Sequence, residues 1–146
     1  MKEKPNISFD YLYRSTWQSI SKMYNEEALK KNSVMTVGFV LISIDYKQGT
    51  PSTLLGPKMG IEATSLSRTL KKMEEQGLIY REKNPDDGRS VLIKLTDKGK
   101  EQRDISKQIV LKFNDEVAKN LTQKQMDAFL VVTETIQELI QKKLIF

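Results

Sequence analysis

The sequence contains no cysteine and no histidine among its 146 residues. Without cysteine the protein has no disulfide, no thiolate nucleophile and no thiol-based redox sensor. Zinc sites built on imidazole or thiolate ligands and Ser-His-Asp catalysis are excluded as well. An enzyme of this composition would have to use carboxylates, lysines, tyrosines or a cofactor. We expect no catalytic residues, no metal site and no cofactor.

Long hydrophobic runs are also lacking. No apolar stretch approaches the roughly 20 residues that a membrane-spanning helix needs, and residues 1–5 are not followed by the apolar segment of a secretory signal. We therefore expect a cytoplasmic protein with no membrane partner. Acidic residues are fewer than basic ones, 19 against 24, which gives a net charge of +5. This excess favours a polyanionic partner but does not require one.

Apolar residues recur at helical spacing over most of the chain, which predicts a mainly α-helical fold. Helices are expected at about residues 8–30, 52–59 and 63–76. Another is expected to start after Thr36 as its N-cap and to end at the break at residues 49–51. Two more are expected after Thr96 and after Thr122. Gly60 and Gly77 are expected to supply the left-handed residues that end two of these helices. Thr122 and Gln125 have the spacing of a capping box.

The periodicity changes between residues 78 and 95. Segments 78–83 and 90–95 are rich in β-branched or aromatic residues, and turn-forming residues lie between them. They predict a small β-hairpin. A short helix, a tight turn, a second helix and a hairpin together form a winged helix-turn-helix, which is a DNA-reading module. The flanking long helices are too apolar to stand alone.

The segment 63–76 has the residue pattern of a helix with two different faces. One narrow face carries Leu66, Leu70 and Met73, which should pack on the domain. The opposite side and its flanks carry hydroxyl and basic side chains, namely Thr64, Ser65, Ser67, Arg68, Lys71 and Lys72. Arg68 can fork onto the two acceptors of a guanine, and the lysines suit phosphates. The alternative is an ordinary solvated face, although no acidic residue interrupts residues 63–73.

The tip of the expected hairpin carries Asp87, Gly88 and Arg89. An arginine at the end of a slender projection can enter the minor groove, whose negative potential attracts it. Asp87 is placed to orient the guanidinium, and the acidic neighbours make a positioned arginine more plausible than bulk attraction. A solvated turn with an incidental charge is the alternative.

Several of these segments together resemble the MarR family of transcription regulators. The similarity rests on residues 55–60, 65–70, 75–79, 84–90 and 95–99, read LGPKMG, SLSRTL, EQGLI, NPDDGRS and LTDKG. It implies a single domain over 1–146, with a DNA-binding lobe at about 36–99 and dimerisation helices at about 8–32 and 100–146. It also implies that 63–76 is the recognition helix and that Arg89 is the wing arginine. Pro57 departs from expectation, because a proline inside the short supporting helix should delay or kink it.

The resemblance further implies a homodimer that binds double-stranded DNA at a pseudo-palindromic operator and is released by a small molecule. Repression is the expected outcome, although the sequence leaves the sign of regulation open. Aromatic walls with one fixed cation would suit an aromatic or fatty organic anion, and the expected pocket residues are Tyr11, Arg14, Trp17, Phe39 and Tyr46. The alternative is that these aromatics are plain core or interface.

Two other classes of function remain open at this point. A winged helix can bind only protein, which would leave the acid-free run around Arg68 unexplained. An enzyme is the weakest alternative, because no nucleotide-binding loop, metal constellation or nucleophile-base pair is present.

Overall fold

The computed structural model describes residues 6–146. Residues 1–5, where we expect no secretory signal, lie outside the described residues. The chain forms two compact units, one that reaches Ile109 and a second that comprises Val110–Phe146. In the described part of the chain, no helix is both long and apolar enough to cross a membrane.

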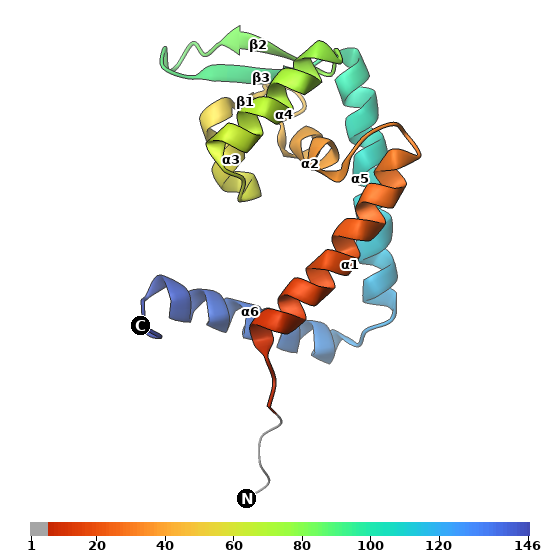
Figure 1. Ribbon diagram of the computed structural model, residues 1–146, viewed down its shortest axis with the longest axis vertical. Coiled ribbons are helices and arrows are strands. Elements are labelled where there is room, and N and C mark those ends of the chain that lie inside the picture. The colour runs from red at the N-terminus through yellow and green to blue at the C-terminus, as the bar shows by residue number, and fades with distance from the viewer. Residues whose placement is uncertain (1–5) are drawn as a thin grey trace, which may run out of the picture. The chain divides into compact units, whose positions relative to one another are not determined.

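The described elements confirm a mainly helical fold with a small β-wing. In chain order they are α1 (Phe9–Leu29), α2 (Met35–Ser43), β1 (Thr50–Pro51), α3 (Ser52–Met59), α4 (Ala63–Glu75), β2 (Ile79–Lys83), β3 (Val91–Leu95), α5 (Asp97–Lys119) and α6 (Gln123–Gln141). In the first unit, α2, α3 and α4 gather beside the sheet (Figure 1). This arrangement is the expected winged helix-turn-helix.

The sheet has one strand more than the sequence predicts. Its order is β1-β3-β2, with both pairs antiparallel, and β1 contributes only Thr50 and Pro51. A segment of two residues is too short to show alternation, so residues 49–51 read only as a helix break. Pro51 is tolerated because β1 is an edge strand, where a missing N–H removes no central ladder bond.

One hydrophobic core holds this lobe together. It combines the buried face of α2, Leu55 of α3 and the apolar face of α4 with residues at the start of β2 and along β3. Its members are Val37, Val40, Leu41, Ile44, Leu55, Leu66, Leu70, Met73, Leu78, Ile79, Ile93 and Leu95. The expected inward face of α4 is confirmed, since Leu66, Leu70 and Met73 are all buried. The core therefore fixes which side of α4 remains outside.

The start of α2 differs from the prediction. The helix begins at Met35, with Val34 as an N-cap that has no side-chain hydrogen bond, so Thr36 lies inside the helix and does not cap it. The Met35 amide donates instead to Asn25 Oδ1 of α1 at 3.0 Å. A side chain ten residues earlier thus satisfies the donor that a local cap would otherwise take.

Helix α3 accommodates Pro57 without starting late. The helix runs without a break from Ser52 to Met59 with Pro57 inside it. The proline removes only one donor, and the following Gly60 ends the helix in the left-handed region at a φ of +65°. Gly77 has a φ of +72° after α4. Both glycine helix ends are therefore confirmed.

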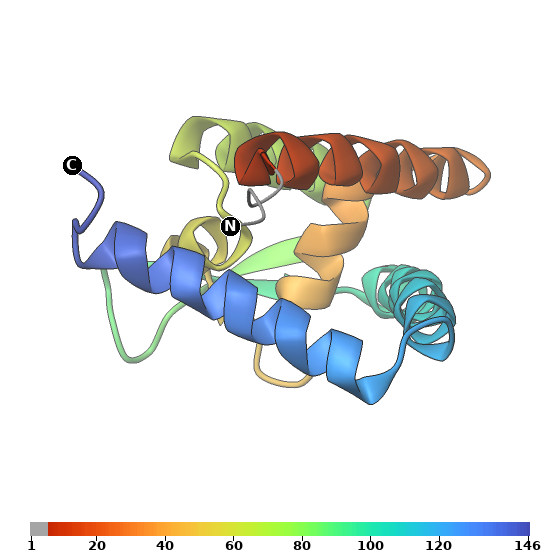
Figure 2. The same ribbon diagram turned by 90° about the horizontal axis from the view of Figure 1, so that it is seen from below.

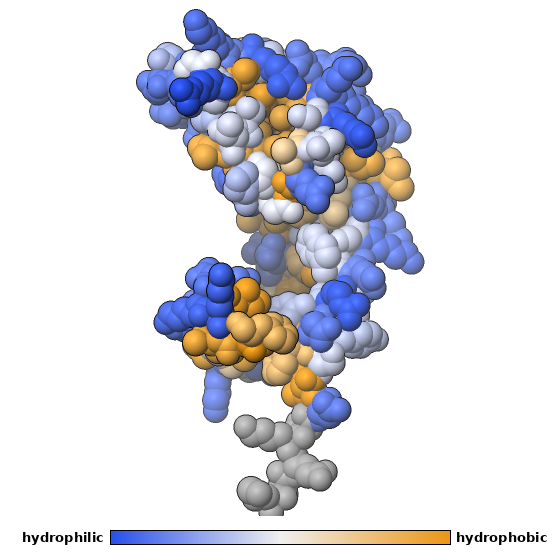
Figure 3. All heavy atoms as spheres, turned by 60° about the vertical axis from the view of Figure 1, so that its left-hand side comes forward, coloured by the Kyte–Doolittle hydropathy of each residue, from blue (hydrophilic) through white to orange (hydrophobic). Residues whose placement is uncertain are grey.

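The second unit consists of the end of α5 and the whole of α6. Figure 2 shows α6 itself as one unbroken helix. The expected capping box is present. Thr122 Oγ1 accepts from the Gln125 amide at 3.1 Å, while Gln125 Oε1 accepts from the Thr122 amide at 2.9 Å. No residue of α6 is buried, and Figure 3 shows apolar side chains gathered on its surface.

Candidate nucleic-acid interface

Helix α4 presents the expected polar face to solvent. The six side chains selected for DNA contact are all exposed, namely Thr64, Ser65, Ser67, Arg68, Lys71 and Lys72. The face begins at the first turn, where Leu66 N donates to the Glu62 carbonyl at 3.0 Å. Because small hydroxyl residues occupy this turn, the backbone can approach a base edge or a phosphate closely.

The three cations of this face are not neutralised within the chain. Among residues 6–146, neither Arg68 nor Lys71 nor Lys72 forms an ion pair. The nearby Glu74 is instead held by Arg81 of β2, with Nε and Oε2 2.7 Å apart. The positive charge of the α4 face is therefore available to an external anion such as DNA phosphate.

Two residues at the start of α5 anchor the end of α4, a role that the sequence did not reveal. Lys98 Nζ donates to the Gln76 carbonyl at 2.9 Å, and Thr96 Oγ1 donates to the Gly77 carbonyl at 2.6 Å. These contacts satisfy carbonyls that a helix end leaves open. Only the spacing of Thr96 as a cap was visible in the sequence. Its oxygen also accepts from the Gly99 amide at 3.0 Å, which confirms that expectation.

The loop between β2 and β3 is braced at its base by a buried polar pair. Asn84 Nδ2 donates to Ser90 Oγ at 2.8 Å, and both residues are buried. The Asp86 amide donates to Asn84 Oδ1 at 3.0 Å. The sequence marked Asn84 and Ser90 only as turn formers, because their pairing depends on how the hairpin closes.

At the wing tip, Asp87 acts on the backbone and not on the guanidinium. Its Oδ1 accepts from the Arg89 amide at 2.9 Å, and its carbonyl accepts from the Ser90 amide at 3.2 Å. Across the described residues, no ion pair joins Asp87 to the Arg89 side chain, which differs from the orienting contact we expected. The turn is ordered, while the exposed Arg89 side chain stays available.

Beside the wing loop, a charged pair joins the two long strands. Lys94 Nζ lies 2.6 Å from Glu82 Oε2, and this hydrogen bond raises the pKa of the Lys94 ammonium above its ordinary value. Lys94 and Glu82 thus neutralise each other within the hairpin. Arg89 at the tip forms no ion pair with any residue from 6 to 146.

The five residues predicted for an effector pocket are divided between different surroundings. Trp17 and Phe39 have ring centroids 6.5 Å apart, and the buried Tyr24 meets Phe39 edge-on at 5.6 Å. Burial raises the pKa of the Tyr24 phenol. Tyr46 lies elsewhere, with Lys100 Nζ 5.0 Å from the centre of its ring.

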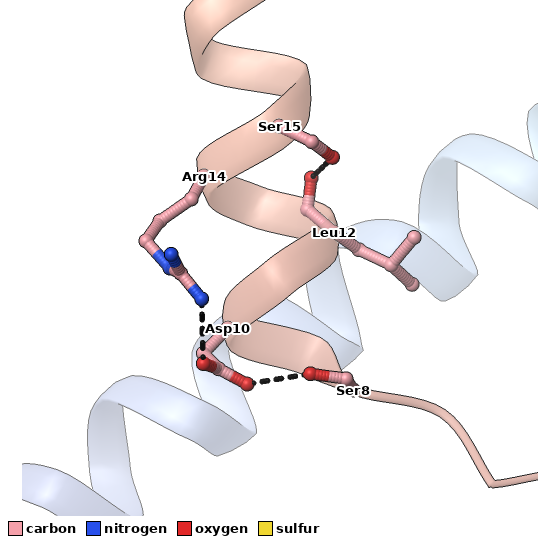
Figure 4. Close-up of polar contacts among 5 residues, drawn as sticks. All are labelled: Ser8, Asp10, Leu12, Arg14 and Ser15. Carbon is pink, nitrogen blue, oxygen red and sulfur yellow. Dashed lines mark hydrogen bonds and ion pairs between the residues drawn. The ribbon is translucent and has the colours of Figure 1, made fainter.

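The cation expected to hold an organic anion already has a carboxylate partner. Arg14 Nη2 lies 3.2 Å from Asp10 Oδ2 at the start of α1 (Figure 4). The Ser8 hydroxyl donates to the same carboxylate at 2.8 Å. Hydrogen bonds from Ser8 and then Arg14 hold the pKa of Asp10 below its ordinary value. Both partners are exposed, so an incoming anion would compete with Asp10 in water.

A metal centre is not among the candidates that the described residues offer. Residues 6–146 contain no group of three or more acidic, histidine or cysteine side chains that could hold a metal ion. The exposed, ion-pair-free face of α4 and the wing are the features that point to a nucleic-acid partner.

Comparison with known proteins agrees with this geometry. The model of the MarR family matches residues 35–91. The transcriptional regulator SarZ of Staphylococcus saprophyticus is 28% identical over 149 residues, which cover 97% of this chain and 96% of that protein. Its name describes an HTH-type regulator, in agreement with the helix-turn-helix of α3 and α4.

Solved structures share the fold. The S. aureus MepR–DNA complex aligns with a TM-score of 0.82 at 18% identity, over 92% of this chain and 100% of that one. A mutant of E. coli MarR complexed with operator DNA aligns with a TM-score of 0.75 at 24% identity, over 87% and 91% of the two chains. This chain belongs to the MarR family of DNA-binding winged helix-turn-helix transcription regulators, a family that is not enzymatic.

Proposed function

We propose that the protein is a repressor that binds a pseudo-palindromic operator as a homodimer and is released by a small-molecule effector. The observation that carries the proposal is the exposed face of α4, whose three cations form no ion pair among residues 6–146. A basic, acid-free face on the second helix of a helix-turn-helix suits the major groove. The structural relatives crystallised with DNA support the same use of the fold.

Within this proposal, the α4 side chains divide by chemistry. Arg68 reads a guanine through its two-pronged guanidinium, while Lys71 and Lys72 contact phosphates. Thr64, Ser65 and Ser67 let the first turn of the helix approach the groove. The wing adds Arg89, which enters the adjacent minor groove on a turn that Asp87 orders.

A homodimer is supported by the apolar surface of α6 and the residues after it. Exposed apolar side chains there include Leu130, Val131, Ile140, Leu144 and Ile145, the first and third being 56% and 57% exposed. Large exposed apolar patches typically mark interaction sites. A second copy would cover this surface and place two recognition helices on successive half-sites about one helical turn apart.

The proposed effector site lies at the contact between Trp17 of α1 and Phe39 of α2. The Trp17–Phe39 contact offers an aromatic wall for a small aromatic or fatty organic anion. A ligand that favours another spacing of the lobes would shift the population away from the DNA-binding dimer. Trp17 is the only tryptophan, so its fluorescence should change saturably as the operator is released. If a broad panel of such carboxylates neither changes the Trp17 fluorescence nor releases the operator, the effector proposal is rejected.

Base reading by α4 is tested by comparing Arg68→Ala with Lys71→Ala. Arg68→Ala should cost about 1–3 kcal/mol on the operator and relax the preference at particular bases, because a bidentate contact is lost. Lys71→Ala should weaken all sequences alike and flatten the salt dependence by about one unit of slope. Fluorescence anisotropy with operator and random duplexes at several salt concentrations measures both.

Lys124→Ala on the exposed surface of α6 serves as the matched control for a lost positive charge. It should leave operator affinity unchanged. If Arg68→Ala lowers affinity equally for operator and random DNA, the base-reading role is wrong.

A further inference from the structure

A hollow of about 420 Å³ lies where α2 ends and the chain turns toward β1. It is lined by residues 42–48 together with Lys58 of α3 and Arg103 of α5, all in the first unit. None of these residues belongs to the basic face of α4 or to the wing. The hollow is therefore a feature that the proposed DNA contacts do not use.

Positive charge dominates the walls of the hollow. Lys47, Lys58 and Arg103 line it against a single carboxylate, Asp45, so three positive charges minus one negative charge leave +2. The one carboxylate is committed to the backbone, since Asp45 Oδ1 accepts from the amides of Lys47 and Gln48 at 3.0 and 2.7 Å. These bonds keep the pKa of Asp45 below its ordinary value.

Lys58 and Arg103 are held at the hollow by contacts other than close ion pairs, although the charge of Arg103 also helps to lower the pKa of Asp45. Lys58 Nζ donates to the Ser43 carbonyl at 3.0 Å, which uses one of its three donors. The Arg103 guanidinium lies over the Tyr46 ring, with Cζ 5.5 Å from its centroid, and its Nε is buried without a hydrogen-bond partner. Within residues 6–146, neither cation forms an ion pair.

We propose that this hollow binds a small anion that carries a phosphate group, with Lys58 and Arg103 as its main contacts. A phosphate dianion matches the excess of two positive charges, and an arginine beside a lysine is a common way to hold phosphate oxygens. The volume leaves room for a small organic substituent beyond the phosphate. The site does not depend on operator binding.

The proposal is tested by isothermal titration calorimetry of the full chain at pH 8, without DNA and with ionic strength held constant by potassium chloride. The probes are inorganic phosphate and glycerol 3-phosphate, with glycerol as the uncharged control. Saturable binding of one or both phosphates and none of glycerol is expected. The ratio of the two affinities tells whether free phosphate or a phosphate ester is preferred.

Lys58→Gln and Arg103→Gln should each weaken phosphate binding about tenfold or more, because each removes a charge-assisted contact. Lys124→Gln removes the same charge at an exposed position of α6 and should have no effect. Circular dichroism checks folding. If Arg103→Gln loses its fold with the Tyr46 packing, the exposed Lys58→Gln variant decides alone.

Two outcomes overturn the proposal. The first is non-saturable binding, or an equal loss in Lys124→Gln, since either would indicate general attraction to a basic protein. The second is phosphate binding that is unchanged in Lys58→Gln while affinity for duplex DNA falls, because Lys58 would then serve as a DNA-backbone contact. Because the calorimetry contains no DNA, its result does not depend on operator binding. If the wild-type protein failed to bind an operator, the proposed function would fail while the phosphate site would still be tested.

Discussion

Gly99 shows how a single residue without a side chain joins two elements. It lies in the first turn of α5 and is buried, and a Cβ built there would lie 1.9 Å from the carbonyl oxygen of Leu78. That carbonyl also accepts the Thr96 amide at 3.1 Å, so it cannot simply rotate away. The close approach ties the start of α5 to the junction between α4 and β2.

Replacing Gly99 with alanine should therefore lower the free energy of unfolding. We expect a loss of about 1–3 kcal/mol from overpacking, measured by urea denaturation. Gly88→Ala is the matched control, because a Cβ at the wing tip meets nothing within 4 Å. The control should stay within about 0.5 kcal/mol of the wild type. Equal stability of the two variants would show that α5 shifts freely and that the close approach is unimportant.

At the scale of the element, the wing separates its structural residues from its proposed DNA contact. Asn84 and Ser90 brace the base of the loop from a buried position, whereas Arg89 is exposed. A buried hydroxyl that loses its partner costs more than an exposed charge that is removed. Structural and contact roles in this hairpin should thus be separable by measuring stability and DNA affinity together.

Arg89→Ala should lower operator affinity and leave the melting temperature unchanged. Asn84→Ala should lower both, with a stability loss of about 1–3 kcal/mol because Ser90 Oγ is left buried without its partner. The double variant Asn84→Ala, Ser90→Ala should recover part of that stability, since the Ser90 hydroxyl is no longer left buried without a partner. Differential scanning calorimetry and anisotropy measure the two properties. A large fall in melting temperature for Arg89→Ala would mark Arg89 as structural instead.

The whole molecule is described as two units, and the second cannot bury its own apolar residues. No residue of α6 is buried, so the surface from Leu130 to Ile145 is open to a partner. A second copy of the chain would cover the same surface on both protomers, as two-fold symmetry requires.

We expect a dimer at micromolar concentration in analytical ultracentrifugation, and a monomer after Ile140→Glu. The substitution places a charge on a side chain that is exposed in the single chain, so the helix should persist while the interface loses apolar area and gains a desolvated carboxylate. Gln137→Glu, at another exposed position of α6, is the control and should remain dimeric. A wild-type monomer under these conditions would rule out the proposed homodimer.

Local patterns in the sequence determined the helix order, the glycine ends after α3 and α4, the capping box of α6 and the buried face of α4. Each of these depends on residues within about one or two helical turns, where spacing alone decides which side chains can meet. The resemblance to a known family came from the same stretches. For this reason the fold class and the candidate recognition face could be predicted without a structure.

The tertiary structure alone decided the contacts between distant segments. It supplied β1 beside β3, Asn25 as the partner of the Met35 amide, and Arg81 as the partner of Glu74. Partners far apart in the chain meet only after the core has closed, so no local periodicity records them. The face of α4 was predictable because it is local, whereas the side chains that hold it in place are set by packing.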